Sequence, residues 1–125
     1  MTIADTCFLI DLMKGDISAE SVARRDRELK TTAISTAEFL YGARRTGRRE
    51  VLDTASTFLH FFPVLPFEAE DAVIYGRIAS ALSESGHRIS TLDELIASIA
   101  LRRREPLLTR DKHFAAIDGL DLVGY

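Results

Sequence analysis

The sequence has only one cysteine, Cys7, among its 125 residues. A single cysteine cannot form an intrachain disulfide, so nothing in the chain requires an oxidising compartment. No apolar run approaches the roughly 18 residues of a membrane-spanning helix. The residues from Met1 to Asp5 also lack the basic and apolar regions of a signal peptide. We therefore expect a cytoplasmic protein that is neither exported nor inserted into a membrane.

Several catalytic motifs are missing as well. The three histidines, His60, His87 and His113, show no HxxH or CxxC-like spacing, so a zinc site is not indicated and we expect them at the surface. There is no GxSxG turn, and Cys7 has no adjacent histidine, so a nucleophilic serine or cysteine is unsupported. The phosphate-binding patterns GxGxxG and GxxxxGK[ST] are also absent, which argues against nucleotide cofactors and kinases.

The composition is that of a globular protein, with 46% hydrophobic and 28% charged residues. Its length predicts one domain that spans residues 1–125. The net charge of −3 provides no overall attraction to nucleic acid. The arginines nevertheless fall into three tight groups, at residues 24–27, 44–49 and 102–104. Each group is either a solvated helix face or a local positive patch.

Short strand-like runs alternate with helix-like segments along the chain. We expect strands at residues 2–4, 31–35, 64–66, 106–109 and 120–123, and helices at 7–13, 18–30, 49–62, 68–85 and 91–104, with a further helix after residue 35. This alternation predicts an α/β fold with a mostly parallel central sheet and helices on both faces. The phenylalanine-rich segment 58–67 is expected in the core or a dimer interface rather than in base stacking.

Four acidic residues fall where such a sheet forms its binding crevice, beyond the carboxyl ends of the strands. Asp5 and Asp111 each follow a predicted strand, and Glu38 lies in the first turn of the helix after residue 35. Asp93 opens another helix, and its spacing to Ile96 directs its side chain along the buried face.

Each acid also has a purely structural explanation. Asp5 and Asp111 are candidate helix N-caps, and the segments 35–38 and 91–94 both match a capping box. Four such coincidences on one side of a sheet are less expected than one shared site. Clustered carboxylates stay ionised only around cations, and otherwise some are protonated through raised pKa values. Oxygen-only ligands favour Mg²⁺ or Mn²⁺ over zinc.

The same acids carry a resemblance to a known family. The segments at residues 5–12, 34–42, 89–97 and 108–114 resemble, in this order, the four motifs of the PIN-domain ribonucleases, and most closely those of VapC toxins from toxin–antitoxin pairs. The similarity covers nearly the whole chain. One departure is Ser90-Thr91, where relatives often have glycine followed by a variable residue. It affects the entry to the site but removes no acid.

The resemblance implies a PIN-like fold and a metal-dependent endoribonuclease that uses Mg²⁺ (or Mn²⁺) to cleave RNA. Asp5 and Asp93 would be the main metal ligands. Glu38 and Asp111 would complete the metal's coordination shell directly or through water. All four acids would be the catalytic residues.

Supporting roles are implied for residues around these acids. Thr6 and Thr109 would position water or phosphate through their hydroxyl groups. The arginine groups would contact RNA phosphates. The resemblance also implies a homodimer, with apolar surface from the phenylalanines at 58, 61 and 62. A cognate antitoxin would place a basic residue in the groove near Glu38 and Asp111.

Other functions fit the residues less well. A haloacid-dehalogenase-type phosphotransfer domain needs Asp-x-Asp where this chain has Asp5-Thr6-Cys7. A phosphate receiver needs an acidic pair on its first strand, which is also missing. The alternative of a different class is a non-catalytic PIN-like RNA-binding or scaffold domain, and the presence of all four acids argues against it.

Overall fold

Five short strands form one sheet at the centre of the protein, in the order β3-β2-β1-β4-β5. The computed structural model describes all 125 residues. The strands are β1 (Thr2–Ala4), β2 (Leu29–Thr32), β3 (Val64–Leu65), β4 (Leu107–Leu108) and β5 (Leu122–Val123). The helices are α1 (Thr6–Met13), α2 (Ile17–Arg25), α3 (Ala33–Arg45), α4 (Arg49–Leu59), α5 (Ala69–Ser85), α6 (Thr91–Arg103) and the short 3₁₀ helix η1 (Lys112–Ala116). Every pair of neighbouring strands is parallel.

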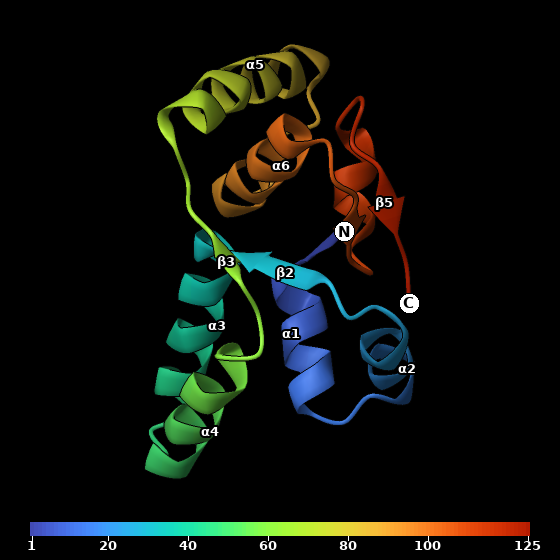
Figure 1. Cartoon of the computed structure of the whole chain (residues 1–125). Helices are drawn as coiled ribbons and strands as arrows, with labels where there is room; N and C mark the ends of the chain where they lie inside the picture. The colour runs from blue at the N-terminus through green and yellow to red at the C-terminus, as the bar shows by residue number, and fades with distance from the viewer.

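The sheet separates two apolar cores. Helices α5 and α6 cover one face, while α1 to α4 cover the other (Figure 1). Side chains alternate between these faces along each strand. Ile3 and its partner Leu107 enter the first core, whereas Ala4 and its partner Leu108 enter the second. The predicted α/β fold, with a parallel sheet between helices, is therefore confirmed.

The chain between α2 and α3 differs from the sequence-based expectation. The predicted helix at 18–30 is too long, because α2 ends at Arg25 and β2 begins at Leu29. Leu29 is buried in the second core, and its strand pairs with β1, so tertiary pairing overrides the local helical pattern. The Thr32 hydroxyl caps α3 by accepting a hydrogen bond from the Ser35 amide at 3.0 Å. Glu38 therefore lies in the second turn of α3 rather than the first.

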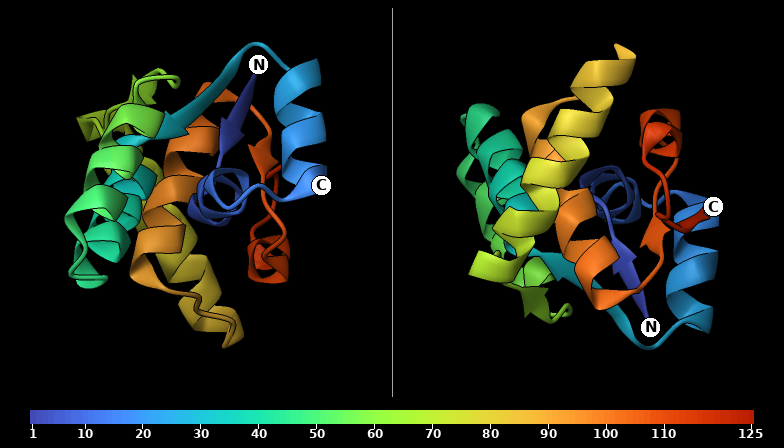
Figure 2. Two further views of the ribbon diagram at one scale, coloured as in Figure 1. Left: turned by 90° about the horizontal axis from the view of Figure 1, so that it is seen from below. Right: turned by 90° about the horizontal axis from the view of Figure 1, so that it is seen from above.

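Two further details of the fold were not predicted. Helix α4 ends at Leu59 rather than at residue 62, and η1 follows β4. The two views of Figure 2 place η1 and β5 beside α6, with the C-terminus near α2. No helix combines the length and apolar character that crossing a membrane would require.

Candidate active site

Asp5 connects the end of β1 to the start of α1. Its buried carboxylate, 4% exposed, accepts hydrogen bonds from the Thr6 amide at 2.7 Å and from the Thr109 hydroxyl at 2.9 Å. The Thr109 oxygen also accepts a hydrogen bond from the Asp111 amide at 3.0 Å. Because β1 and β4 are neighbours in the sheet, their carboxyl ends bring these two loops together. One threonine hydroxyl thus joins Asp5 to the segment that carries Asp111.

Glu38 reaches the same edge of the sheet from α3. The Thr6 hydroxyl donates a hydrogen bond of 2.7 Å to Glu38 Oε1, which links the first turn of α1 to the second turn of α3. Burial raises the pKa of the half-buried Glu38 carboxyl group, and the nearby charge of Asp93 raises it further. Thr6 therefore has a polar partner within the acidic site.

Asp93 completes the group from the first turn of α6. Burial raises its pKa, and the charge of Asp111 adds to this effect. Burial also raises the pKa of Asp5 to about 6, although hydrogen bonds from Thr109 and Thr6 oppose the shift, and Asp93 makes a smaller contribution in the raising direction. The four acids predicted from sequence thus form one electrostatically connected group.

This group contains no compensating lysine or arginine. Asp5, Glu38 and Asp93 make no ion pair, and the only ionisable partner of Asp111 is the exposed ring of His113, with Nδ1 at 2.9 Å. No three histidine, cysteine, aspartate or glutamate side chains lie close enough to enclose an ion directly. Mg²⁺ usually keeps several water ligands and binds one or two carboxylates, so a spread set of carboxylates suits it better than it suits tetrahedral zinc.

The capping alternatives have mixed outcomes. Asp5 and Asp111 do cap α1 and η1, as that interpretation predicted. The two capping boxes are wrong, because Thr32 caps α3 and Ser90 caps α6. The side chain of Glu94 is instead fully buried and accepts two hydrogen bonds from Arg88.

One residue near the acids, Cys7, was not recognised from the sequence as part of the site. Cys7 Sγ lies 3.4 Å from Asp5 Oδ2 and 3.3 Å from Thr109 Oγ1, and burial raises the pKa of its thiol. The only sequence signal for Cys7 was its place in the first acidic motif. Arg110 adjoins Asp111 in the chain, but its guanidinium pairs with Asp11 at 3.4 Å and lies 4.8 Å from the ring centre of Tyr125.

The arginine groups have different environments. Arg102 binds the fully buried Asp71 and also contacts Glu68, and Arg103 contacts Glu68 at 3.3 Å. These two arginines join α6 to α5, so the expected phosphate-binding role does not hold for them. Arg44 and Arg45, at the end of α3, are exposed and have no carboxylate within ion-pair distance.

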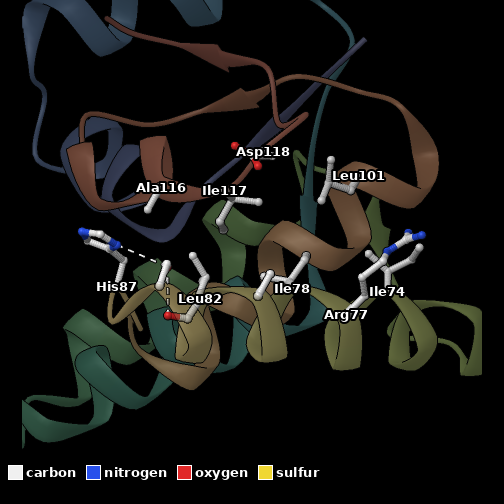
Figure 3. Close-up of a pocket in the computed structure, with 11 residues that line it drawn as sticks. Ile74, Arg77, Ile78, Leu82, His87, Leu101, Ala116, Ile117 and Asp118 are labelled. Carbon is white, nitrogen blue, oxygen red and sulfur yellow. Dashed lines mark hydrogen bonds between the residues drawn. The ribbon is translucent and has the colours of Figure 1, made fainter.

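A well-formed pocket lies away from the acids (Figure 3). It has a volume of about 630 Å³ between α5, α6 and the residues after η1. Its walls include Ile78, Leu82 and Ile117, with Asp118 at its edge. None of the four acids lines it, so the acidic site is an open edge of the sheet rather than this cavity. The histidines at 60, 87 and 113 are exposed, as predicted.

Known proteins are similar to this chain in sequence and in fold. The PIN domain family model matches residues 2–120. The chain is 30% identical to Ribonuclease VapC of Rickettsia bellii over 126 residues, which cover 97% of this chain and 93% of that protein. It is also 30% identical to Ribonuclease VapC5 of Mycobacterium tuberculosis over 111 residues, which cover 82% of each.

Solved structures give the same assignment of the fold. VapBC2 from Rickettsia felis, bound to a promoter DNA fragment, matches with a TM-score of 0.90 and 24% identity over 99% of this chain and 98% of that one. DNA-bound VapBC from Salmonella typhimurium matches with a TM-score of 0.92 and 21% identity over 98% and 96%. The chain belongs to the PIN domain family, and within it to the VapC-type proteins.

Proposed function

We propose that this protein is a Mg²⁺- or Mn²⁺-dependent endoribonuclease and the toxin of a VapBC-like toxin–antitoxin pair. One observation carries the proposal: four acids from separate segments lie near one another and have no lysine or arginine partner. They are Asp5, Glu38, Asp93 and Asp111. The curated relatives named as ribonucleases support the reaction class. The VapBC complexes among the structural neighbours support an antitoxin partner.

The residues present fit a hard divalent cation. Asp5 and Asp93 would hold it, with Glu38 and Asp111 bound directly or through water. Burial is the main cause of the raised pKa values of Asp5, Glu38 and Asp93, and a cation bound among these carboxylates offsets the penalty for their ionisation. When bound, such an ion activates water and neutralises charge on the phosphate and its leaving oxygen.

The chain itself orients the reacting groups. Thr109 fixes one oxygen of Asp5, and Thr6 fixes Oε1 of Glu38, so neither carboxylate can rotate freely. Glu38 Oε2 has no hydrogen-bond partner within the chain. It is therefore the oxygen of this residue that is available to accept a proton from an attacking water.

We further propose a homodimer, with a smaller aromatic contribution than the sequence implied. Phe62 is buried, and the Phe58 ring packs 5.6 Å from Phe39 and 5.3 Å from Phe62. The expectation that all three phenylalanines supply interface surface is therefore wrong. Only Phe61 is highly exposed, at 78%.

Cleavage of RNA by the purified chain tests the nuclease proposal. We expect cleavage of single-stranded RNA with Mn²⁺ or Mg²⁺, and no cleavage in EDTA. Asp93→Asn should lose the activity, whereas Asp53→Asn, an exposed acid on α4, should keep it. Binding of Mn²⁺ at the acidic site without cleavage of any RNA would favour the non-catalytic scaffold instead.

A further inference from the structure

Helix α3 presents an exposed aromatic ring and an arginine beside the acidic site. Tyr41 and Arg45 follow Glu38 by three and seven residues, so the helical period places all three on one flank of α3. The Tyr41 residue is 65% exposed, and the Arg45 guanidinium lies 5.8 Å from its ring centre. Figure 1 shows α3 extending away from the sheet. At 1.5 Å per residue, Arg45 lies about 10 Å along the helix axis from Glu38.

Packing within the chain does not explain these two side chains. Arg45 makes no ion pair, in contrast to Arg102 on α6. Gly42 lies on the same flank of α3, and a Cβ added there would meet nothing within 4 Å. Glycine in a helix interior costs about 1 kcal/mol relative to alanine. A bare stretch of backbone beside an exposed ring suits the close approach of a ligand from outside.

We propose that Tyr41 and Arg45 bind single-stranded RNA next to the scissile phosphate. This inference rests on the proposed nuclease function. Tyr41 stacks against an unpaired base, and Arg45 contacts a backbone phosphate. The acids repel a phosphate chain, and the protein has a net charge of −3, so productive binding requires local cations beside the acids. The open backbone at Gly42 lets the strand lie against α3 between these groups.

RNA affinity can be measured without cleavage in an Asp93→Asn background. The probe is a short fluorescein-labelled single-stranded RNA, followed by fluorescence anisotropy with Mn²⁺ over a range of salt concentrations. Tyr41→Ala should raise Kd about tenfold, whereas Tyr41→Phe should stay within twofold because it keeps the stacking ring. Arg45→Gln should raise Kd and reduce the slope of log Kd against log salt by about 0.7, the value for one phosphate contact on a single strand.

Arg44→Gln is the matched control for Arg45→Gln. Both arginines are exposed and lack an ion pair, but Arg44 lies on a different side of α3, so its removal should change Kd less than twofold. Equal effects of the two substitutions would overturn the proposal. An unchanged Kd for Tyr41→Ala would also overturn the proposal. This holds even if light scattering shows that the variant no longer forms a dimer.

Cleavage assays separate this inference from the nuclease proposal. In the otherwise wild-type chain, Tyr41→Ala and Arg45→Gln should raise KM more than they lower kcat, because they act on binding away from the reacting atoms. A wild-type chain that neither binds nor cleaves RNA would refute the nuclease function and this inference together. A wild-type chain that cleaves RNA with KM unaffected by both substitutions would refute this inference alone.

Discussion

Replacing Asp5 by asparagine should make the stability of the metal-free protein less dependent on pH. Burial raises the pKa of the Asp5 carboxyl group from 3.8 to about 6 in the folded state. In the unfolded chain it returns to its ordinary value. Between these two values the folded protein holds a proton that the unfolded chain has released. The free energy of unfolding therefore falls as the pH rises through this interval.

The size of the effect follows from the size of the pKa shift. A shift of about two units, at about 1.4 kcal/mol for each unit, corresponds to roughly 3 kcal/mol. This contribution is fully present below about pH 4 and is lost above about pH 6. For a protein of this length it corresponds to a change of roughly 10 °C in Tm. The asparagine side chain of the variant is neutral at every pH in this range, so the variant should lack this pH-dependent loss.

Urea unfolding in EDTA between pH 4 and pH 7.5 measures this difference. The free energy of unfolding of Asp5→Asn, minus that of the wild-type protein, should increase by roughly 2–3 kcal/mol across the range. Taking the difference removes the titration of other groups. Asp53→Asn, which changes an exposed acid, should give a nearly flat difference. Parallel curves for Asp5→Asn and the wild-type protein would show that burial does not raise the Asp5 pKa.

Three other outcomes are expected. Asp93→Asn should reduce RNA cleavage by more than 100-fold in a gel assay while its metal-free Tm stays equal or rises, because one repulsive charge is lost; wild-type cleavage would contradict this. Inhibition by a cognate antitoxin should weaken as the Mg²⁺ concentration rises at fixed ionic strength, because an arginine of the antitoxin and the ion compete for the same carboxylates. Constant inhibition would leave only steric blocking of RNA as the explanation. Arg102→Ala should lower Tm by several degrees in thermal melts, because it leaves the buried carboxylate of Asp71 without its cationic partner, and an unchanged Tm would disprove that role.

The position of the acidic site could be predicted because it depends on chain order. Strands that alternate with helices form a parallel sheet, and residues that follow such strands lie at one edge. Asp5 and Thr109 follow neighbouring strands, and their hydrogen bond of 2.9 Å spans 104 residues of sequence. No knowledge of side-chain packing was needed to expect these loops on the same side.

The boundary between α2 and β2 could not be predicted from local sequence. Residues 26–28 separate α2 from β2, and none of them is a glycine or proline that would mark the end of a helix. The strand is determined by its pairing with β1, where the Thr31 hydroxyl donates a buried hydrogen bond of 2.9 Å to the Ala4 carbonyl. That partner lies 27 residues earlier in the chain. The predicted strand at 31–35 was also wrong at its end, because α3 begins at Ala33, and this error placed Glu38 one turn too early in the helix.

Whether an arginine group forms ion pairs within the protein depends on acids that are far away in sequence. Residues 44–45 and 102–103 are both arginine pairs at the C-terminal end of a helix, where cations favour the helix dipole. Only the second pair lies next to a helix that presents Glu68 and the buried Asp71. Charge patterning along one helix therefore cannot separate a structural arginine from a free one.

Hydrogen-bond capacity explains why threonines accompany the acids at this edge. A hydroxyl group has one donor and two acceptor positions, whereas an ionised carboxylate can only accept. Thr109 uses its donor for Asp5 and accepts from the Asp111 amide, so a single group orients two acidic segments. Thr6 uses its donor in the same way for Glu38. A lysine in either place would neutralise the acids, while a hydroxyl holds them and leaves their charge for a cation.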